Sequence, residues 1–398
     1  MTSPTASLAS LSGPGLSKQR RTLLVAGLAH ALHDGYTDMI YVLLPVWQTE
    51  FGLGYAALAL LRGLYAGTMA GLQVPSGSVA DRFGGRIVLA LGTALAGFGY
   101  ILAGFSGSLP GLCMALAVAG AGSSTQHPIG SAAVSRVYGS KARGPLGIYN
   151  FSGDLGKAAL PVAVSLLLAG MHWRGALRVI AALGLAVAIA VGIFMPSTDG
   201  ARNDRKDFNL IPRTAGRGGF PMLFAIGVLD TATRMGLLIF LPFLLKAKGA
   251  ALPTIGLALA LVFMGGAAGK FACGWLGARI GMLWTVLLTE GGTAAAILLV
   301  LGLPLVPTLI LLPVLGIMLN GTSSVLYGTV PELTAADQAE RSFALFYTGT
   351  IGSGAIAPVL FGMLGDTVGA SWATVATAVT ALATLPLAIA LAPRLGPD

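Results

Sequence analysis

The chain is poor in charge and in cysteine. Charged residues make up only 10% of its 398 residues, whereas hydrophobic residues make up 55%. A soluble domain carries about 25% charged residues, so too few polar side chains remain here to cover a soluble core of this size. The composition therefore excludes a soluble globular protein. The two cysteines, Cys113 and Cys273, both lie in apolar stretches, so we expect free buried thiols and no disulfide.

Two sequence patterns are also absent. The chain has no Gly-x-x-x-x-Gly-Lys-Ser/Thr pattern, so we expect no phosphate-binding loop and no use of ATP as an energy source. It has no cysteine–histidine cluster with the spacing of a zinc site. We therefore predict no metal site and no other cofactor.

Long apolar stretches follow one another along the chain, and each is long enough to cross a bilayer. They predict an all-α integral membrane protein with twelve transmembrane helices. The predicted spans are about 22–47, 58–80, 87–107, 110–137, 144–170, 173–195, 219–245, 252–276, 282–303, 307–330, 342–365 and 371–392.

The distribution of positive charge predicts the orientation. Of the 24 Lys and Arg residues, sixteen fall in the two tails and in the loops on the same side, and four fall at the opposite side. Because Lys and Arg gather on the cytoplasmic side of membrane proteins, we expect both termini in the cytoplasm and a multi-pass location in the inner (plasma) membrane. Topology thus explains the net charge of +9, and we predict no nucleic-acid partner.

The chain also resembles a duplication. A charged, Pro- and Gly-containing stretch at 196–218 divides a first half, 22–195, from a second half, 219–393, after an N-terminal tail, 1–21. Matching residues recur 197 positions apart, namely Pro45 and Pro242, Gly77 and Gly274, Arg82 and Arg279, Gly84 and Gly281, and Pro161 and Pro358. We therefore predict two pseudo-symmetric six-helix bundles joined by a cytoplasmic linker.

The run 77–86, Gly-Ser-Val-Ala-Asp-Arg-Phe-Gly-Gly-Arg, carries the most specific motif. We read it as a tight charged loop between the second and third spans, and it resembles the signature loop of the major facilitator superfamily. The resemblance implies a cytoplasmic gate in which Gly77, Asp81, Arg82 and Arg86 form a conformational latch. In the matching run of the second half the acid is replaced by Ala278, so we expect the latch to be stronger in the first half.

Three further runs narrow the resemblance. His-Ala-Leu-His-Asp at 30–34, Gly-Ser-Ser-Thr-Gln-His-Pro at 122–128 and Asn-Phe-Ser-Gly-Asp-Leu-Gly at 150–156 resemble the fosmidomycin-resistance branch of that superfamily. The chain departs from this branch at Ile129, where the branch has an acid, and at Asp154 and Lys157, where it has neutral residues. The resemblance implies proton-coupled drug export, and the departures leave the substrate open.

The resemblance and the duplicated halves together indicate a secondary active transporter. Such proteins work by alternating access, with the substrate site near the membrane midplane between the halves. We expect a small-molecule substrate, protons and the lipid bilayer as partners, a monomeric state and no enzymatic activity.

Polar residues in the first predicted span are candidates for proton coupling. His30, Asp34 and Asp38 are spaced i, i+4 and i+8, which places them on one helix face with His33 beside them. Asp34 and Asp38 are about 6 Å apart along the axis, so their titrations can be coupled. The alternative is that His30 and Asp34 only pair with each other to hold the helix in place.

Charged residues in two later spans are candidates for substrate binding. Asp154 and Lys157 in the fifth span are spaced i, i+3, and Asp230 and Arg234 in the seventh are spaced i, i+4. Each pair can be a structural salt bridge, but Arg234 also offers a fork of donors that suits a carboxylate, phosphate or phosphonate group.

Other intramembrane polar residues have weaker signals. Gln126 and His127 precede Pro128 in the fourth span and are included as substrate-binding candidates. We expect Glu290 to be peripheral and structural, and Arg62 to extend its head group to the membrane interface.

Three functions fit these residues. The first is a proton-coupled antiporter that exports an anionic or zwitterionic compound. The second is an importer or anion exchanger that uses Arg234 and Lys157. The third is a divalent-metal transporter or a metal-sensing membrane protein, which would use His30, His33, Asp34 and His127. It is the least favoured, because these residues offer only imidazole and carboxylate and both cysteines lie elsewhere.

Overall fold

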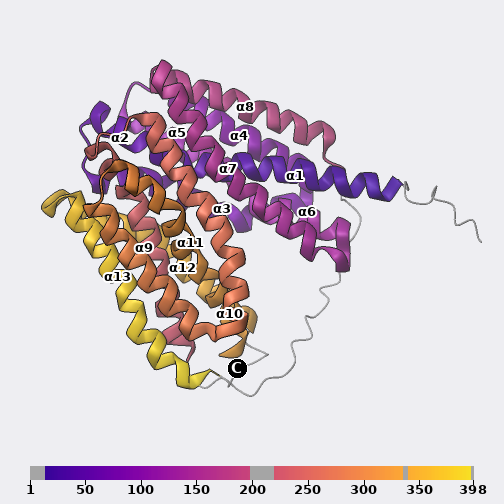
Figure 1. The fold of residues 1–398 in the computed structure, drawn as a ribbon. Coiled ribbons are helices and arrows are strands. Elements are labelled where there is room, and N and C mark those ends of the chain that lie inside the picture. The colour runs from indigo at the N-terminus through magenta and orange to yellow at the C-terminus, as the bar shows by residue number, and fades with distance from the viewer. Residues whose placement is uncertain (1–13, 198–218, 335–338, 396–398) are drawn as a thin grey trace, which may run out of the picture. The chain divides into compact units, whose positions relative to one another are not determined.

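The structure is a computed structural model that describes residues 14–197, 219–334 and 339–395 (Figure 1). Within these ranges it is helical throughout, with no strand. This agrees with the predicted all-α fold, because every backbone donor and acceptor inside a bilayer must be satisfied within the segment. Most of the predicted linker, 196–218, and much of the predicted tail, 1–21, lie outside the described residues.

The α-helices keep the order of the predicted spans. They are α1 (Pro14–Asp38), α2 (Ile40–Phe51), α3 (Tyr55–Phe83), α4 (Gly85–Phe105), α5 (Leu109–Ser123), α6 (Gln126–Tyr138), α7 (Arg143–Gly170), α8 (Trp173–Phe194), α9 (Phe220–Ala247), α10 (Leu252–Gly302), α11 (Leu305–Thr329), α12 (Ala339–Val368) and α13 (Ala370–Leu391).

The helices account for the predicted spans, with three differences in detail. The first span is the pair α1 and α2, which meet at Met39, and the fourth is the pair α5 and α6, which meet at Ser124 and Thr125. The helix α10 contains the eighth and ninth spans, joined at Gly281. By length and hydropathy alone, eight helices in the described part of the chain could cross a membrane.

The predicted charged loop between the second and third spans was wrong in its extent. The helix α3 continues to Phe83 and α4 begins at Gly85, so Asp81 and Arg82 lie in the last turn of α3. Gly84 alone makes the reversal, with φ +89°. Glycine adopts this left-handed backbone without a steric penalty, so a longer loop is not needed.

Backbone conformation repeats at the spacing predicted for the duplication. Gly52 and Gly249 have φ +63° and +88°, and Gly84 and Gly281 have φ +89° and +77°. Each pair is separated by 197 residues, and both members of each pair end or connect helices. The same unusual conformation at two matching positions is the structural counterpart of the sequence repeat.

The described residues form two compact units, which do not coincide with the two sequence halves. Of the described residues, unit 1 comprises 14–34, 68–156 and 177–197, and unit 2 comprises 35–67, 157–176, 219–334 and 339–395. The boundaries of the halves drawn from the sequence thus stay a prediction.

In unit 1, close packing depends on small residues. The helix α4 packs on α5 and α6, and a Cβ at Gly99 would contact Ala119, while one at Gly122 would contact Ala96. Small residues allow the backbones of membrane helices to approach in this way.

In unit 2, α9 packs on α12, α13, α11, α10 and α2. Beyond this packing, the carboxylate of Asp366 on α12 accepts hydrogen bonds from the backbone N–H groups of Tyr55 and Ala56, at 2.6 and 3.1 Å. An acid at a helix N-terminus is favourable because the first N–H groups there have no partner within the helix. This contact joins the start of α3 to the second half of the chain.

Arg62 is a correction to the sequence analysis. Its side chain was expected to extend its head group outward, but it is buried within the protein, with 6% exposure. The guanidinium lies 5.2 Å from the centroid of the Tyr41 ring. The aromatic face attracts the cation and replaces part of the water that an exposed head group would have contacted.

Candidate functional site

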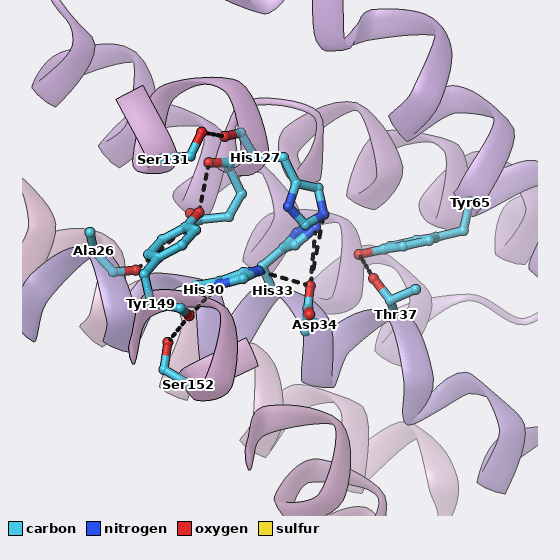
Figure 2. A network of polar contacts seen from close by, with 11 residues as sticks. Ala26, His30, His33, Asp34, Thr37, Tyr65, His127, Ser131, Tyr149 and Ser152 are labelled. Carbon is cyan, nitrogen blue, oxygen red and sulfur yellow. Dashed lines mark hydrogen bonds and ion pairs between the residues drawn. The ribbon is translucent and has the colours of Figure 1, made fainter. Parts of the chain in front are cut away.

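Unit 1 contains a histidine–aspartate cluster, formed by His30, His33, Asp34 and His127 (Figure 2). The Nε2 atoms of His30, His33 and His127 lie 3.5, 3.9 and 3.8 Å from the same oxygen, Oδ1 of Asp34. His30, His33 and Asp34 are between 3% and 7% exposed. Three imidazole nitrogens thus converge on one buried carboxylate.

Two helices supply the cluster. The spacing of His30 and Asp34 places them one turn apart on α1, as predicted. His127 comes from the first turn of α6, just after the break between α5 and α6. Its ring stands nearly perpendicular to those of His30 and His33, at 83° and 88°. We predicted His127 as a substrate contact, and the structure brings it to Asp34.

The protonation of His30 follows from its partners. Its Nδ1 lies 2.8 Å from the backbone carbonyl oxygen of Tyr149, and the two rings are stacked with centroids 4.2 Å apart. A carbonyl can only accept, so Nδ1 must carry a proton. In neutral His30 the lone pair therefore lies on Nε2, which is buried and makes no hydrogen bond within the described structure. This lone pair faces the Asp34 carboxylate.

Gly153 on α7 leaves the space that the cluster occupies. A Cβ at this position would lie 2.6 Å from Oδ2 of Asp34 and 2.9 Å from Nε2 of His30. One turn later, a Cβ at Gly156 would overlap the backbone of Ala31. The two glycines allow α7 to approach α1 closely, so any larger residue at 153 must displace the cluster.

Gln126 lies beside the cluster, and its side chain connects α6 to α1 and α7 by hydrogen bonds. Its Nε2 donates to the carbonyl of Ala26 and to the hydroxyl of Tyr149, both at 3.4 Å. The Tyr149 hydroxyl in turn donates to the backbone carbonyl oxygen of Gln126, at 3.3 Å. Because the side chain is 2% exposed and occupied by these bonds, its contacts are those of a structural residue.

Unit 2 contains a second group of buried polar residues, which we call the arginine–acid site: Asp230 and Arg234 on α9, Glu290 on α10 and Asn320 on α11. Nη1 of Arg234 donates to Oδ1 of Asn320 at 3.3 Å, and Nε of Arg234 is buried without a hydrogen-bond partner in the described structure. At least one N–H donor of the Arg234 guanidinium therefore makes no hydrogen bond to these residues.

For Arg234 the sequence left open either a structural salt bridge with Asp230 or a contact with substrate. Within the described residues Asp230 and Arg234 make no ion pair of 4 Å or less, and Asp230 is hydrogen-bonded to Glu290. Both acids are buried, at 3% and 2% exposure. Two carboxyl groups can hydrogen-bond to each other only when one of them carries a proton, so this contact offers a place where a proton can be held beside Arg234.

The other predicted site residues with charged side chains lie on α1 and α7. Asp38 is the last residue of α1 and is buried, at 7% exposure. Asp154 and Lys157 lie one turn apart on α7, and Asp154 is 6% exposed. These positions fit residues that influence an interior site.

The predicted latch residues lie at the end of α3 and the start of α4. Asp81 and Arg82 are exposed, whereas Gly77 and Arg86 are half-buried. The guanidinium of Arg82 lies 5.5 Å from the ring centroid of Phe83. Gly77 and Asp81 line a small pocket together with residues of α6, including Arg136.

Sequence reasoning missed Tyr149, Glu290 and Asn320 as parts of these sites. Glu290 carried a signal, since a charge inside a span is expensive and usually functional, but its position along the chain suggested a peripheral helix. Tyr149 contributes a backbone carbonyl to His30, and no side-chain pattern reports such a contact.

Membrane-length helices that bury ionisable side chains define a class of protein. Such residues mark substrate and ion pathways, and polar sites in a duplicated helical fold are typical of secondary transporters. The fold and the two groups of polar residues therefore define a multi-pass membrane transporter.

The chain belongs to the Major Facilitator Superfamily, whose sequence profile matches residues 26–217 and 223–398. It is 26% identical over 354 residues to the "Probable sulfoacetate transporter SauU" of Cupriavidus necator, covering 82% of each chain. It is 25% identical to the "Fosmidomycin resistance protein" of Escherichia coli over 142 residues, which cover 36% of this chain and 35% of that protein. The predicted family and its fosmidomycin-resistance relative are thus confirmed.

Solved structures show the same fold. A bacterial homologue of the human lysosomal transporter Spinster, in an inward-facing and occupied conformation, superposes with a TM-score of 0.79. The match covers 95% of this chain and 97% of that one at 16% sequence identity. At this identity the similarity concerns the architecture and says nothing of the substrate.

Proposed function

We propose that this transporter is a proton-coupled antiporter that exports a small anionic or zwitterionic molecule across the inner membrane. The observation that carries the proposal is the convergence of three imidazole nitrogens on Asp34. Without a proton, the Nε2 lone pair of His30 and the Asp34 oxygen repel each other. With one, they form a charge-assisted hydrogen bond. Histidine gains and loses protons near neutral pH, so the cluster suits reversible uptake of a proton.

Arg234 supports an anionic substrate. Its guanidinium keeps its charge, and its buried Nε has no hydrogen-bond partner in the described structure. A planar donor fork matches the oxygens of a carboxylate, phosphate or phosphonate group. The name of the Cupriavidus necator relative refers to sulfoacetate, which is such an anion. The substrate contacts would include Arg234 and Asn320, with Asp154 and Lys157 as further candidates.

Alternating access completes the proposal. The chain would act as a monomer with both termini in the cytoplasm, and Asp81, Arg82 and Arg86 would close the inner gate around Gly77. The charge bias of the loops supports this orientation.

Reconstituted protein tests the coupling. In proteoliposomes with an imposed pH gradient, we expect sulfoacetate to move in the direction opposite to the flow of protons. Asp34→Asn should abolish this movement while sulfoacetate counterflow continues. Counterflow needs the substrate site but no net proton transfer. Asp38→Asn is the comparison, and a proton shared with Asp34 predicts partial loss there.

Three results would contradict parts of the proposal. Loss of both activities in folded Asp34→Asn would make Asp34 a substrate or structural residue. Sulfoacetate and protons moving in the same direction would favour the alternative of an importer. If the protein does not transport sulfoacetate but does transport another organic anion, only sulfoacetate is rejected as the substrate.

A further inference from the structure

We propose that the histidine–aspartate cluster also binds one divalent transition-metal ion of the zinc type. The chain has four histidines, and three of them meet at the carboxylate of Asp34 (Figure 2). Ligand atoms of His30, Asp34 and His127 all lie within 4.8 Å of one another. A cysteine thiolate is not required, because histidine and carboxylate side chains alone can bind zinc.

The distances are close to those of a tetrahedral site. With zinc–ligand bonds of about 2.0–2.1 Å, two ligand atoms of a tetrahedron are separated by roughly 3.4 Å. The Nε2 atoms of His30 and His127 lie 3.5 and 3.8 Å from Oδ1 of Asp34. The ligand atoms of His30 and His127 lie within 4.8 Å of each other, so these two side chains must move closer together to bind one ion. His33, at 3.9 Å from the same oxygen, or a water can supply the fourth ligand.

His30 already has the orientation of a metal ligand. A metal-bound histidine almost always donates its second ring N–H to a carbonyl or carboxylate. Here Nδ1 of His30 faces the carbonyl of Tyr149 at 2.8 Å, which leaves the Nε2 lone pair available. This Nε2 is buried, faces Asp34 and lacks a hydrogen-bond partner within the described ranges. A cation between them would turn their repulsion into two favourable bonds.

Access also fits an ion. The absent Cβ of Gly153 allows Oδ2 of Asp34 and Nε2 of His30 to lie directly against the backbone of α7. The His127 side chain is 40% exposed, whereas those of His30 and Asp34 are 4% and 10% exposed. His127 is therefore the open side of an otherwise enclosed site, and it provides a path for an ion to enter.

The ligand set selects the metal. Imidazole suits Zn²⁺, Ni²⁺, Cu²⁺ and Co²⁺, whereas Ca²⁺ and Mg²⁺ prefer oxygen ligands. The same atoms would bind the coupling proton, so metal and proton compete for the cluster. This consequence rests on the proposed function: a bound metal would inhibit gradient-driven transport, and its affinity would fall as the pH falls, because the ligands must be deprotonated.

Calorimetric titration of the purified full-length protein with ZnCl₂ tests binding without any substrate. We expect one Zn²⁺ per chain, proton release on binding and weaker binding at lower pH. Titration with CoCl₂ should give the visible absorption bands of tetrahedral Co²⁺. MgCl₂ should give no binding signal.

Matched variants identify the site. His127→Ala should weaken Zn²⁺ binding by more than the roughly 10–100-fold that loss of a supporting contact costs. His172→Ala is the control, because this fourth histidine has a side chain 58% exposed, 3.9 Å from Glu50. Gly153→Ala should also weaken binding, by filling the space next to Asp34. Thermal unfolding of each variant without metal separates loss of the site from loss of the fold.

The outcomes separate the two proposals. Equal binding by the wild type and His127→Ala, or binding lost in His172→Ala, would overturn the metal site. Zn²⁺ that binds and is itself transported would overturn its role as a competitor of the proton. Failure of sulfoacetate transport would leave the titration unaffected, so each proposal can fail alone.

Discussion

The histidine–aspartate cluster and the arginine–acid site differ in the kind of charge that they hold. The first contains three imidazoles around one carboxylate, all of which can change protonation. The second contains a guanidinium that remains positive and two carboxyls that share a hydrogen bond. A duplicated fold has thus diverged in chemistry while its backbone conformation at Gly84 and Gly281 was retained.

The offset of 197 residues shows which positions of the two sites are equivalent. It aligns His33 with Asp230 and Thr37 with Arg234, so equivalent positions carry groups of different charge. We infer that the two halves divide the work, with proton exchange in the first and anion binding in the second. Substitutions in the second half and at the gates test this division.

Arg234→Lys should cause the largest loss of substrate affinity. Lysine keeps the charge but cannot reproduce two parallel hydrogen bonds. Breaking such a buried contact costs about 2–5 kcal/mol, which is roughly 30- to several-thousand-fold in affinity. Binding of sulfoacetate to the purified protein measures this effect, and thermal unfolding without substrate should change little. Unchanged affinity would make Arg234 structural and remove the main argument for an anionic substrate.

Glu290→Gln should have a smaller effect, directed at pH dependence. An amide can donate to Asp230 without a shared proton, so the substitution keeps the hydrogen bond and fixes one negative charge beside Arg234. We expect substrate affinity to change by no more than about tenfold, since a net hydrogen bond contributes about 0.5–1.5 kcal/mol.

The pH profile of substrate affinity is the sharper readout for this variant. It should become flatter in Glu290→Gln, while gradient-driven transport through Asp34 continues. The control is Thr322→Val: Thr322 is a buried residue of α11 that hydrogen-bonds to Glu290, so this variant removes a contact of Glu290 but no acid. Loss of proton coupling in Glu290→Gln would contradict the division between the halves.

Two exposed acids near opposite ends of α3 should show the smallest effects. Asp81 belongs to the proposed inner gate, and we assign Asp366, which binds the start of α3, to the outer gate. Asp366→Asn removes the charge that accepts from the N–H groups of Tyr55 and Ala56, and loss of a capping interaction costs about 0.5–2 kcal/mol. Under the proposed orientation it should shift the population toward the outward-open state, whereas Asp81→Asn should shift it toward the inward-open state. Spin-label distances across the loops measure both shifts, and two shifts in the same direction would refute the assignment of opposite gates.

Much of the fold could be predicted because hydrophobicity and spacing are local properties. Apolar stretches long enough to cross a bilayer must become helices there, and the recurrence of Gly84 at Gly281 reported the duplication. The breaks at Met39 and at Ser124–Thr125 were missed, because the flanking residues remain apolar or helix-compatible and no proline or glycine lies at the break itself.

The sites were only partly predictable. The stripe of His30 and Asp34 follows from helical spacing alone. The addition of His127 depends on how α6 packs beside α1, and the pairing of Asp230 with Glu290 depends on the contact of α9 with α10. Arg62 was misjudged for the same reason, since sequence position does not report the Tyr41 ring beside it.

The membrane-embedded helical fold, its repeat and the identity of its ionisable residues can all be read from the amino-acid sequence. Those features depend on hydrophobicity, on charge and on separation along the chain. Only the tertiary structure decided which ionisable residues share a site, because residues 93 positions apart, such as Asp34 and His127, meet through helix packing. The physical reason is that the bilayer specifies where a helix runs, whereas close contacts such as that of Gly153 with the cluster specify which side chains face each other.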